Sequence, residues 1–153
     1  FGKALPFEPR VRPMLEALSA LGIPLGIITN RDREFFTHEL GNVDGEDWSG
    51  HFSTSVCGDD TPRRKPHPDQ IELAVSQLDV SLDGSVWYVG DSTTDTIAAI
   101  NAGVTSVFFN GAQWDLPWLN KIFPGNERFP HKPDVVVNDF AEFWALVLAC
   151  RRK

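Results

Sequence analysis

The amino-acid sequence predicts an α/β protein, a three-layer α/β/α sandwich built on a mostly parallel sheet. Short apolar runs of strand length alternate with segments whose apolar residues recur at helical spacing. The 153 residues, 42% hydrophobic and 23% charged, have the composition of an ordinary globular domain. Strands and helices that alternate at this spacing pair in parallel through right-handed crossovers, which puts helices on both faces of the sheet.

The first part of the chain predicts two helices and two strands. Apolar residues recur at helical spacing from Val11 to Leu21, and Gly22 follows as a helix stop. The β-branched run that comes next ends at polar residues and is typical of a strand buried on both faces. The predicted order is helix 11–21, strand 23–30, helix 32–40, acidic loop 41–50 and a weaker strand 51–56.

The remainder of the chain continues the alternation. Pro68 is suited to open a helix whose apolar stripe runs from Ile71 to Leu78, and Gly103 is suited to end a later one. Residues 111–133 are long for a loop, and the apolar letters WDLPWLNKIF within them predict a packed excursion with a short helix. The other predicted elements are strand 85–91, helix 94–103, strand 105–110, strand 134–140 and helix 141–150.

Charge and cysteine content narrow the class of partner. A net charge of −7 argues against general binding to nucleic acid or to anionic membranes, since both require a basic surface. Cys57 and Cys150 are the only cysteines and form no metal-binding pattern, which is typical of a reduced, cytoplasmic protein. No apolar stretch approaches the roughly 18–20 residues needed to span a bilayer. These features argue against nucleic-acid and membrane partners and leave the oligomeric state open.

Polar residues follow the predicted strands where ligands of parallel sheets bind. Thr29 and Asn30 come after the first strand, Lys65 after the second, and Asp91 after the run VWYVG. Because the carboxyl ends of parallel strands meet at one edge of a sheet, we expect these residues to converge there.

Asp91 and Asp95 allow two interpretations. If both carboxylates faced one spot about 4 Å apart, they would repel by about 4 kcal/mol at an effective dielectric of 20, and a cation such as Mg²⁺ would relieve this. Gly90 would let the backbone approach such a site closely. Alternatively, Ser92 or Thr93 caps the next helix and Asp95 is a first-turn acid favoured by the helix dipole.

Thr29, Asn30 and Lys65 also have structural alternatives. Thr29 and Asn30 supply a hydroxyl, an amide and backbone N–H groups that suit a phosphate, although such a pair is also a common strand exit. Lys65 belongs to a basic turn that could simply be solvated. Pro66 and Pro68 stiffen the chain after Lys65 and would lower the entropy lost in aiming its ammonium group inward.

The sequence resembles the haloacid dehalogenase superfamily, and most closely its phosphoglycolate-phosphatase-like hydrolases. The resemblance rests on GIITN, KPHP and VWYVGDSTTDTIAAINAG, which match motifs II, III and IV in this order, and it runs from about residue 9 to residue 110. It implies a Rossmann-like core.

The resemblance also implies an activity and a role for each matching residue. The protein would be a Mg²⁺-dependent phosphatase that hydrolyses small phosphorylated metabolites through an aspartyl-phosphate. Thr29 would hydrogen-bond the transferring phosphoryl group with Asn30 beside it, and Lys65 would neutralise the negative charges. Asp91 would bind Mg²⁺, and Asp95 would bind the ion directly or through water.

The family's motif I, D-x-D-x-[TV], supplies the nucleophile and does not occur in this sequence. We therefore expect residues 1–153 to be the C-terminal part of a single hydrolase core, with the central motif I strand and any cap domain upstream of Phe1. Only 35 residues separate Thr29 from Lys65, too few for a large cap. Two alternatives are an inactive module that binds a phosphorylated ligand or a protein, and a phosphotransferase or phosphomutase of the same superfamily.

Overall fold

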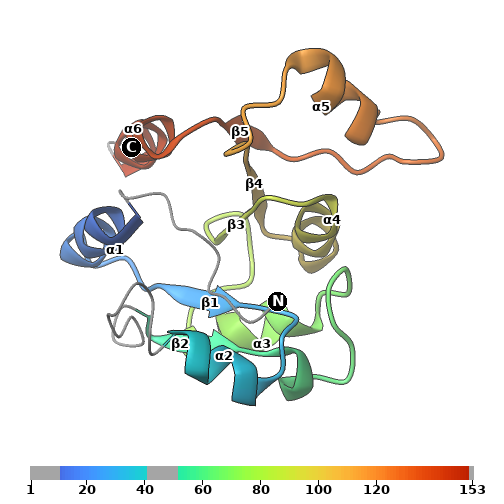
Figure 1. The fold of residues 1–153 in the computed structure, drawn as a ribbon. Helices are drawn as coiled ribbons and strands as arrows, with labels where there is room; N and C mark the ends of the chain where they lie inside the picture. The colour runs from blue at the N-terminus through green and yellow to red at the C-terminus, as the bar shows by residue number, and fades with distance from the viewer. Residues whose placement is uncertain (1–10, 41–51, 152–153) are drawn as a thin grey trace. The chain divides into compact units, whose positions relative to one another are not determined.

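A computed structural model describes residues 11–40 and 52–151 of the chain (Figure 1). They fall into two compact units: residues 1–64 with 69–80, and residues 65–68 with 81–153. The positions of the two units relative to one another are not determined, so each is described by itself. The predicted loop over residues 41–50 lies outside the described residues.

The first unit contains a two-stranded parallel sheet and three helices. β1 (Gly26–Ile28) pairs with β2 (Thr54–Val56), and α3 (Asp69–Leu78) packs against both strands. The unit also contains α1 (Val11–Ala20), α2 (Arg33–Leu40) and the 3₁₀ turn η2 (Gly58–Asp60).

Part of the core of this unit is formed by Phe36 and Cys57, against which Leu15, Ile27 and Phe52 pack. The prediction that the first strand is buried on both faces is wrong for the described part of the chain. Gly26 is exposed and the rest of β1 is only partly buried, because β1 pairs with β2 alone among the described strands.

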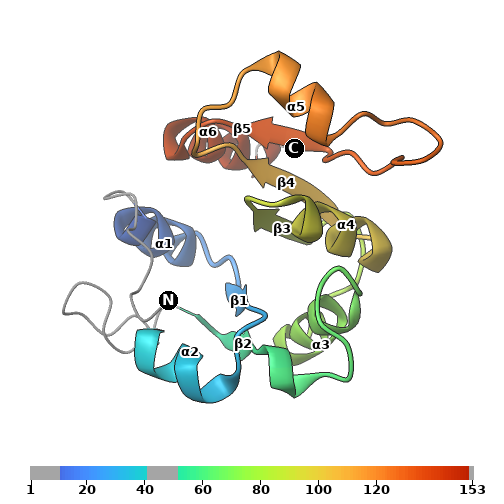
Figure 2. The same cartoon turned by 45° about the vertical axis from the view of Figure 1, so that its right-hand side comes forward.

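The second unit contains a three-stranded parallel sheet in the order β3–β4–β5 (Figure 2). Its strands are β3 (Trp87–Gly90), β4 (Thr105–Phe109) and β5 (Val135–Val137), and its helices are α4 (Thr93–Ala102), α5 (Leu116–Ile122) and α6 (Phe140–Arg151). The prediction of parallel pairing is thus confirmed within each unit. The described strands form two sheets rather than one continuous sheet.

Strand alternation shows that helices cover both faces of the second sheet. Trp87 and Phe109 belong to one face, because Trp87 pairs with Thr105 and side chains alternate along a strand. Both rings contact α6, Trp87 through Phe143 at 6.1 Å between ring centroids and Phe109 through Phe140 at 4.6 Å. Tyr88, on the opposite face, bonds to α4. The predicted three-layer arrangement is therefore present in this unit.

The helix ends follow the predicted chemistry. Ser92 is the N-cap of α4, and its hydroxyl accepts a hydrogen bond from the Asp95 backbone N–H at 3.2 Å. Gly103 ends α4 in the left-handed region, with φ of 78°, where a side chain would be strained. α5 lies within the predicted excursion and is capped by Asp115. No helix among the described residues is long and apolar enough to cross a membrane.

Candidate functional site

Lys65 and Asp95 form a partly buried ion pair within the second unit. The Lys65 Nζ atom lies 2.7 Å from Asp95 Oδ1, and the two side chains are only 11% and 14% exposed. Lys65 lies in the turn before α3, and Asp95 lies in the first turn of α4. The positive charge that faces Asp95 is thus supplied by the chain itself, from 30 residues away in sequence.

Tyr88 completes this cluster and was not identified from the sequence. Its hydroxyl accepts a hydrogen bond from Lys65 Nζ at 2.9 Å and donates one to Asp95 Oδ1 at 3.1 Å. Burial, and then the neighbouring Asp95 carboxylate, raise the pKa of the Tyr88 phenol well above its usual range. The phenol therefore stays neutral and can hold both charged groups in place. We define Lys65, Tyr88 and Asp95 as the Lys65 cluster.

The raised pKa of Tyr88 predicts a loss of stability in alkali. The unfolded chain releases the phenol proton near pH 10, whereas the folded chain retains it. Stability is therefore fully present below about pH 10 and falls as the pH rises further, by at most about 1.4 kcal/mol per pH unit from this group. Urea unfolding at pH values above about 10 should show this loss of stability for the wild-type protein and not for Tyr88→Phe, which has no phenol proton to release.

Tyr88 is the only tyrosine, so tyrosinate absorbance reports on this side chain alone within the chain. The native protein should show no tyrosinate signal until it unfolds. A phenol that ionises near pH 10 in the folded protein would contradict the burial and the hydrogen bonds described above.

Asp95 also shows that the capping interpretation holds. Its Oδ2 atom accepts a hydrogen bond from the Ser92 hydroxyl at 3.0 Å, and its backbone N–H is the group that Ser92 caps. Its carboxylate is therefore shared between Lys65, Tyr88 and Ser92. These three partners offset the charge of Asp95, so this carboxylate does not by itself require a metal ion.

Asp91 differs from Asp95 in having no such partners. It follows β3 directly, is exposed, and makes no hydrogen bond or ion pair with the described residues. A carboxylate held at a strand end without a partner suits a hard cation. Mg²⁺ usually takes one or two carboxylates and completes its shell with water and substrate oxygens. No group of three or more acidic, histidine or cysteine side chains that could hold a metal occurs within the described ranges.

Gly90 permits a close approach of β3 to the first turn of α4. A Cβ atom at Gly90 would lie 2.4 Å from the Cβ of Asp95 and 2.5 Å from its Oδ2. Gly90→Ala should therefore displace Asp95 from Lys65 and lower the free energy of unfolding by about 1–3 kcal/mol. Urea unfolding measures this.

Gly84→Ala is the matched control, because a Cβ there would meet only Thr105 Oγ1, at an ordinary 3.6 Å. Equal effects of the two substitutions would contradict the assigned packing.

Thr29 and Asn30 lie in the first unit, at the end of β1. The Thr29 hydroxyl oxygen accepts a hydrogen bond from the Arg31 N–H at 3.1 Å, and its own hydrogen remains available for donation. The Thr29 carbonyl accepts one from the buried Gln70 amide at 2.7 Å. Arg64 donates to the Asn30 carbonyl at 2.7 Å. The turn after β1 is thus held in place by hydrogen bonds to its backbone carbonyl groups.

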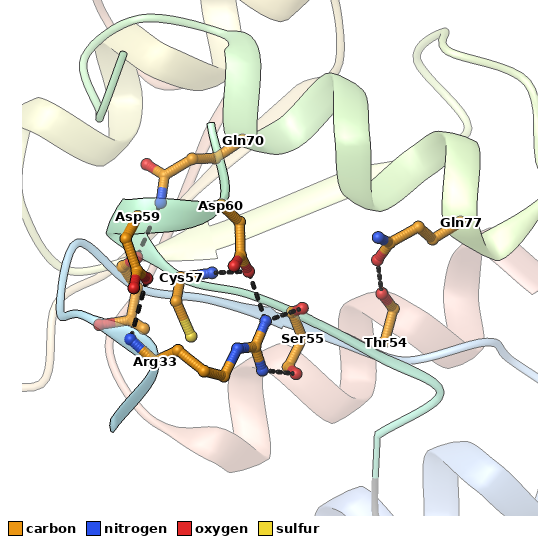
Figure 3. A network of polar contacts seen from close by, with 9 residues as sticks. Arg33, Thr54, Ser55, Cys57, Asp59, Asp60, Gln70 and Gln77 are labelled. Carbon is orange, nitrogen blue, oxygen red and sulfur yellow. Dashed lines mark hydrogen bonds and ion pairs between the residues drawn. The ribbon is translucent and has the colours of Figure 1, made fainter. Parts of the chain in front are cut away.

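A network around Arg33 joins the loops that follow β1 and β2 (Figure 3). The Arg33 guanidinium donates to the Ser55 hydroxyl at 2.7 Å, to the Ser55 carbonyl at 2.9 Å and to Asp60. Asp60 also accepts from the Cys57 N–H, and Asp59 from the Arg33 N–H. Burial raises the pKa of the Cys57 thiol above its usual value. These two aspartates are engaged in structural contacts.

The chain matches the haloacid dehalogenase-like hydrolase family over residues 3–109 and belongs to that family. It is 37% identical over 99 residues to a phosphoglycolate phosphatase of Escherichia coli strain K12, a match that covers 65% of this chain and 38% of that protein. The chain thus spans well under half of the length of this relative. The predicted similarity to phosphoglycolate phosphatases is confirmed.

Two solved structures share the fold. A predicted phosphoglycolate phosphatase from Haemophilus somnus is 26% identical, with a TM-score of 0.72 over 91% of this chain and 56% of that one. A HAD-superfamily hydrolase from Ehrlichia chaffeensis is 16% identical, with a TM-score of 0.71 over 97% of this chain and 63% of that one. The Rossmann-like α/β core expected from the sequence is confirmed.

The predicted site residues thus fall into two sets. Lys65 and Asp95 are in contact, and Asp91 directly follows β3 in the same unit. Thr29 and Asn30 belong to the other unit, so their convergence with Lys65 stays a prediction. Tyr88 was detectable in principle, because strand alternation puts it on the same face as Gly90, toward α4.

Proposed function

We propose that this chain forms part of a Mg²⁺-dependent phosphatase that hydrolyses small phosphorylated metabolites through an aspartyl-phosphate intermediate. The observation that carries the proposal is the Lys65 cluster in the same unit as Asp91, which ends β3 and bonds to none of the described residues. A fixed ammonium group and a free carboxylate are the groups that phosphoryl transfer requires, because its catalysis consists mainly of positioning and charge neutralisation.

Under this proposal each of the predicted site residues has a role. Lys65 neutralises charge on the phosphoryl oxygens, and Tyr88 and Asp95 act as positioning residues that hold its ammonium group. Thr29 donates its hydroxyl hydrogen to a phosphoryl oxygen, with Asn30 beside it. Asp91 binds Mg²⁺, and Asp95 binds the ion directly or through water. When bound, Mg²⁺ would neutralise the developing negative charge.

The nucleophile is proposed to lie outside residues 1–153. The sequence contains no D-x-D, and Asp32, Asp59 and Asp60 are each hydrogen-bonded to arginines. Under this proposal the two units are parts of one hydrolase core, and the strand that carries the nucleophile is supplied by an upstream segment. This chain alone would then bind phosphate without hydrolysing its esters.

Further support for the substrate class comes from the relatives. The Escherichia coli relative is named a phosphoglycolate phosphatase, which acts on a small phosphorylated compound by that name. The acidic net charge argues against general binding to nucleic acid or anionic membranes, and the two isolated cysteines support a reduced, cytoplasmic protein.

The test is phosphate release from a generic aryl phosphate in the presence of Mg²⁺. The protein that includes the upstream segment should release phosphate, and residues 1–153 alone should not. If the longer protein binds phosphorylated ligands without turnover, it is a binding module. If it passes the phosphoryl group to a sugar, product analysis identifies a phosphotransferase or phosphomutase. Either of these two results would overturn the proposed hydrolysis.

A further inference from the structure

An aromatic pocket adjoins Asp91 in the second unit. One lobe, of about 320 Å³, is lined by Asp91, Phe108, Asn110 and Trp114 among others. A second lobe, of about 280 Å³, shares Asp91, Phe108 and Trp114 and adds Trp118 and Ile122 from α5. Both lobes therefore place the Asp91 carboxylate, which bonds to none of the described residues, next to an aromatic wall formed by Phe108, Trp114 and Trp118.

The aromatic wall is held in position by buried polar contacts. Asn110 is 1% exposed, and its amide donates to the Trp114 carbonyl at 2.9 Å and to Asn138 Oδ1 at 2.8 Å. Its Oδ1 accepts from the Trp114 N–H at 3.1 Å. Asn110 thus fixes both backbone groups of Trp114, whose ring lies 6.4 Å from Phe108 in a stacked arrangement.

The two indole rings remain available to a ligand. Trp114 is 41% exposed and Trp118 is 42% exposed, with ring centroids 6.0 Å apart in an edge-to-face arrangement. Phe123, by contrast, is buried and packs edge-to-face against Phe108, with ring centroids 5.0 Å apart. An exposed aromatic pair that is anchored from behind by a buried amide and a buried ring is suited to hold a planar apolar group.

We propose that this pocket binds the alcohol portion of the substrate, and that the preferred substrates are phosphate monoesters whose alcohol carries an aromatic or similarly planar apolar group. This inference rests on the proposed function, because it assumes that the phosphate is bound beside Asp91. The lobe is large enough for one ring, since cavities of about 150 Å³ bind benzene. The apolar group would lie on Trp114 while the phosphate remains at the polar strand end.

The test compares benzyl phosphate with propyl phosphate, which release alkoxides of similar basicity, so that the comparison reports binding rather than leaving-group chemistry. In the protein with its upstream segment, kcat/KM should favour benzyl phosphate by about tenfold. Trp114→Ala should remove most of this preference, because the benzyl ester loses more contact area than the propyl ester. Trp118→Ala provides a second variant if Trp114→Ala does not fold.

Leu116→Ala is the matched control, because Leu116 lies on α5, is 68% exposed and does not line the pocket. It should keep the wild-type preference. Equal kcat/KM values for the two esters, or a preference that survives in both tryptophan variants, would overturn the assignment while leaving the phosphatase proposal intact.

Binding provides a readout that does not depend on turnover. Benzylphosphonate should bind more tightly than methylphosphonate by calorimetry, and Trp114→Ala should remove the difference. This pattern without phosphate release would support the pocket and overturn the phosphatase proposal. Equal affinities of the two phosphonates for the wild-type protein would overturn the pocket itself.

Discussion

Replacing Lys65 with methionine is expected to lower the free energy of unfolding by about 3 kcal/mol and to abolish phosphate release. The substitution keeps most of the side-chain volume but removes the ammonium group that faces Asp95 at 2.7 Å. Because the Asp95 side chain is only 14% exposed, its charge would lose a close partner where water compensates poorly. Urea unfolding and phosphate release measure the two effects.

Arg64→Met is the matched control for this prediction. Arg64 also pairs with an aspartate, at 2.6 Å from Asp32, but the two side chains are 48% and 46% exposed. Exposed ion pairs contribute at most about 1 kcal/mol, so this variant should lose much less stability than Lys65→Met. The double variant Lys65→Met with Asp95→Asn should recover part of the lost stability, because no uncompensated charge remains. Equal destabilisation by Lys65→Met and Arg64→Met would contradict the partly buried pair.

Replacing Asp91 with alanine is expected to reduce phosphate release by a factor of about 10³ and to leave stability almost unchanged. The loss follows from the proposed role of Asp91 as a metal ligand, since a single preorganised electrostatic group contributes about 10²–10³ to the rate. Stability should change by no more than about 0.5 kcal/mol, because the carboxylate is exposed and bonds to none of the described residues. The measurements are steady-state kinetics and urea unfolding of the same preparations.

Glu127→Ala is the control for Asp91→Ala, because Glu127 is also an exposed acid and lies outside the pocket. It should retain wild-type activity. Phosphate release by Asp91→Ala at the wild-type rate would exclude the assigned role. A large loss of stability in this variant would show instead that Asp91 has a structural role.

Most of the secondary structure could be predicted because its signals are local. Gly103 after an apolar stripe predicts a left-handed helix stop, and the helix α4 ends there. Ser92 ahead of the same helix predicts a cap, and it caps Asp95. The short helix within residues 111–133 was predicted from its apolar residues and begins after Asp115.

The burial of β1 was predicted wrongly, because the burial of a strand depends on which strands pair with it. An apolar, β-branched run resembles a strand flanked on both sides, whereas β1 pairs with β2 alone among the described strands. Local sequence carries no information on whether a neighbouring strand is present.

The site shows the same division between local and distant information. Spacing along the chain left two interpretations of Asp91 and Asp95 open, a shared cation and helix capping. The structure shows that Asp95 also pairs with Lys65, a contact across 30 residues that sequence spacing could not supply. The shared cation stays a prediction. Tyr88 was overlooked because a tyrosine in an apolar strand is typical of a core residue, and its hydrogen bonds become visible only when Lys65 and Asp95 have been placed.

The most direct test of the account is the metal dependence of phosphate release by a protein that includes the proposed upstream segment. The wild-type protein should lose activity on treatment with EDTA and regain it on addition of Mg²⁺, whereas Asp91→Ala should remain inactive at every Mg²⁺ concentration. Activity that persists in EDTA, or that Mg²⁺ restores equally in the wild type and in Asp91→Ala, would contradict a magnesium site at the end of β3.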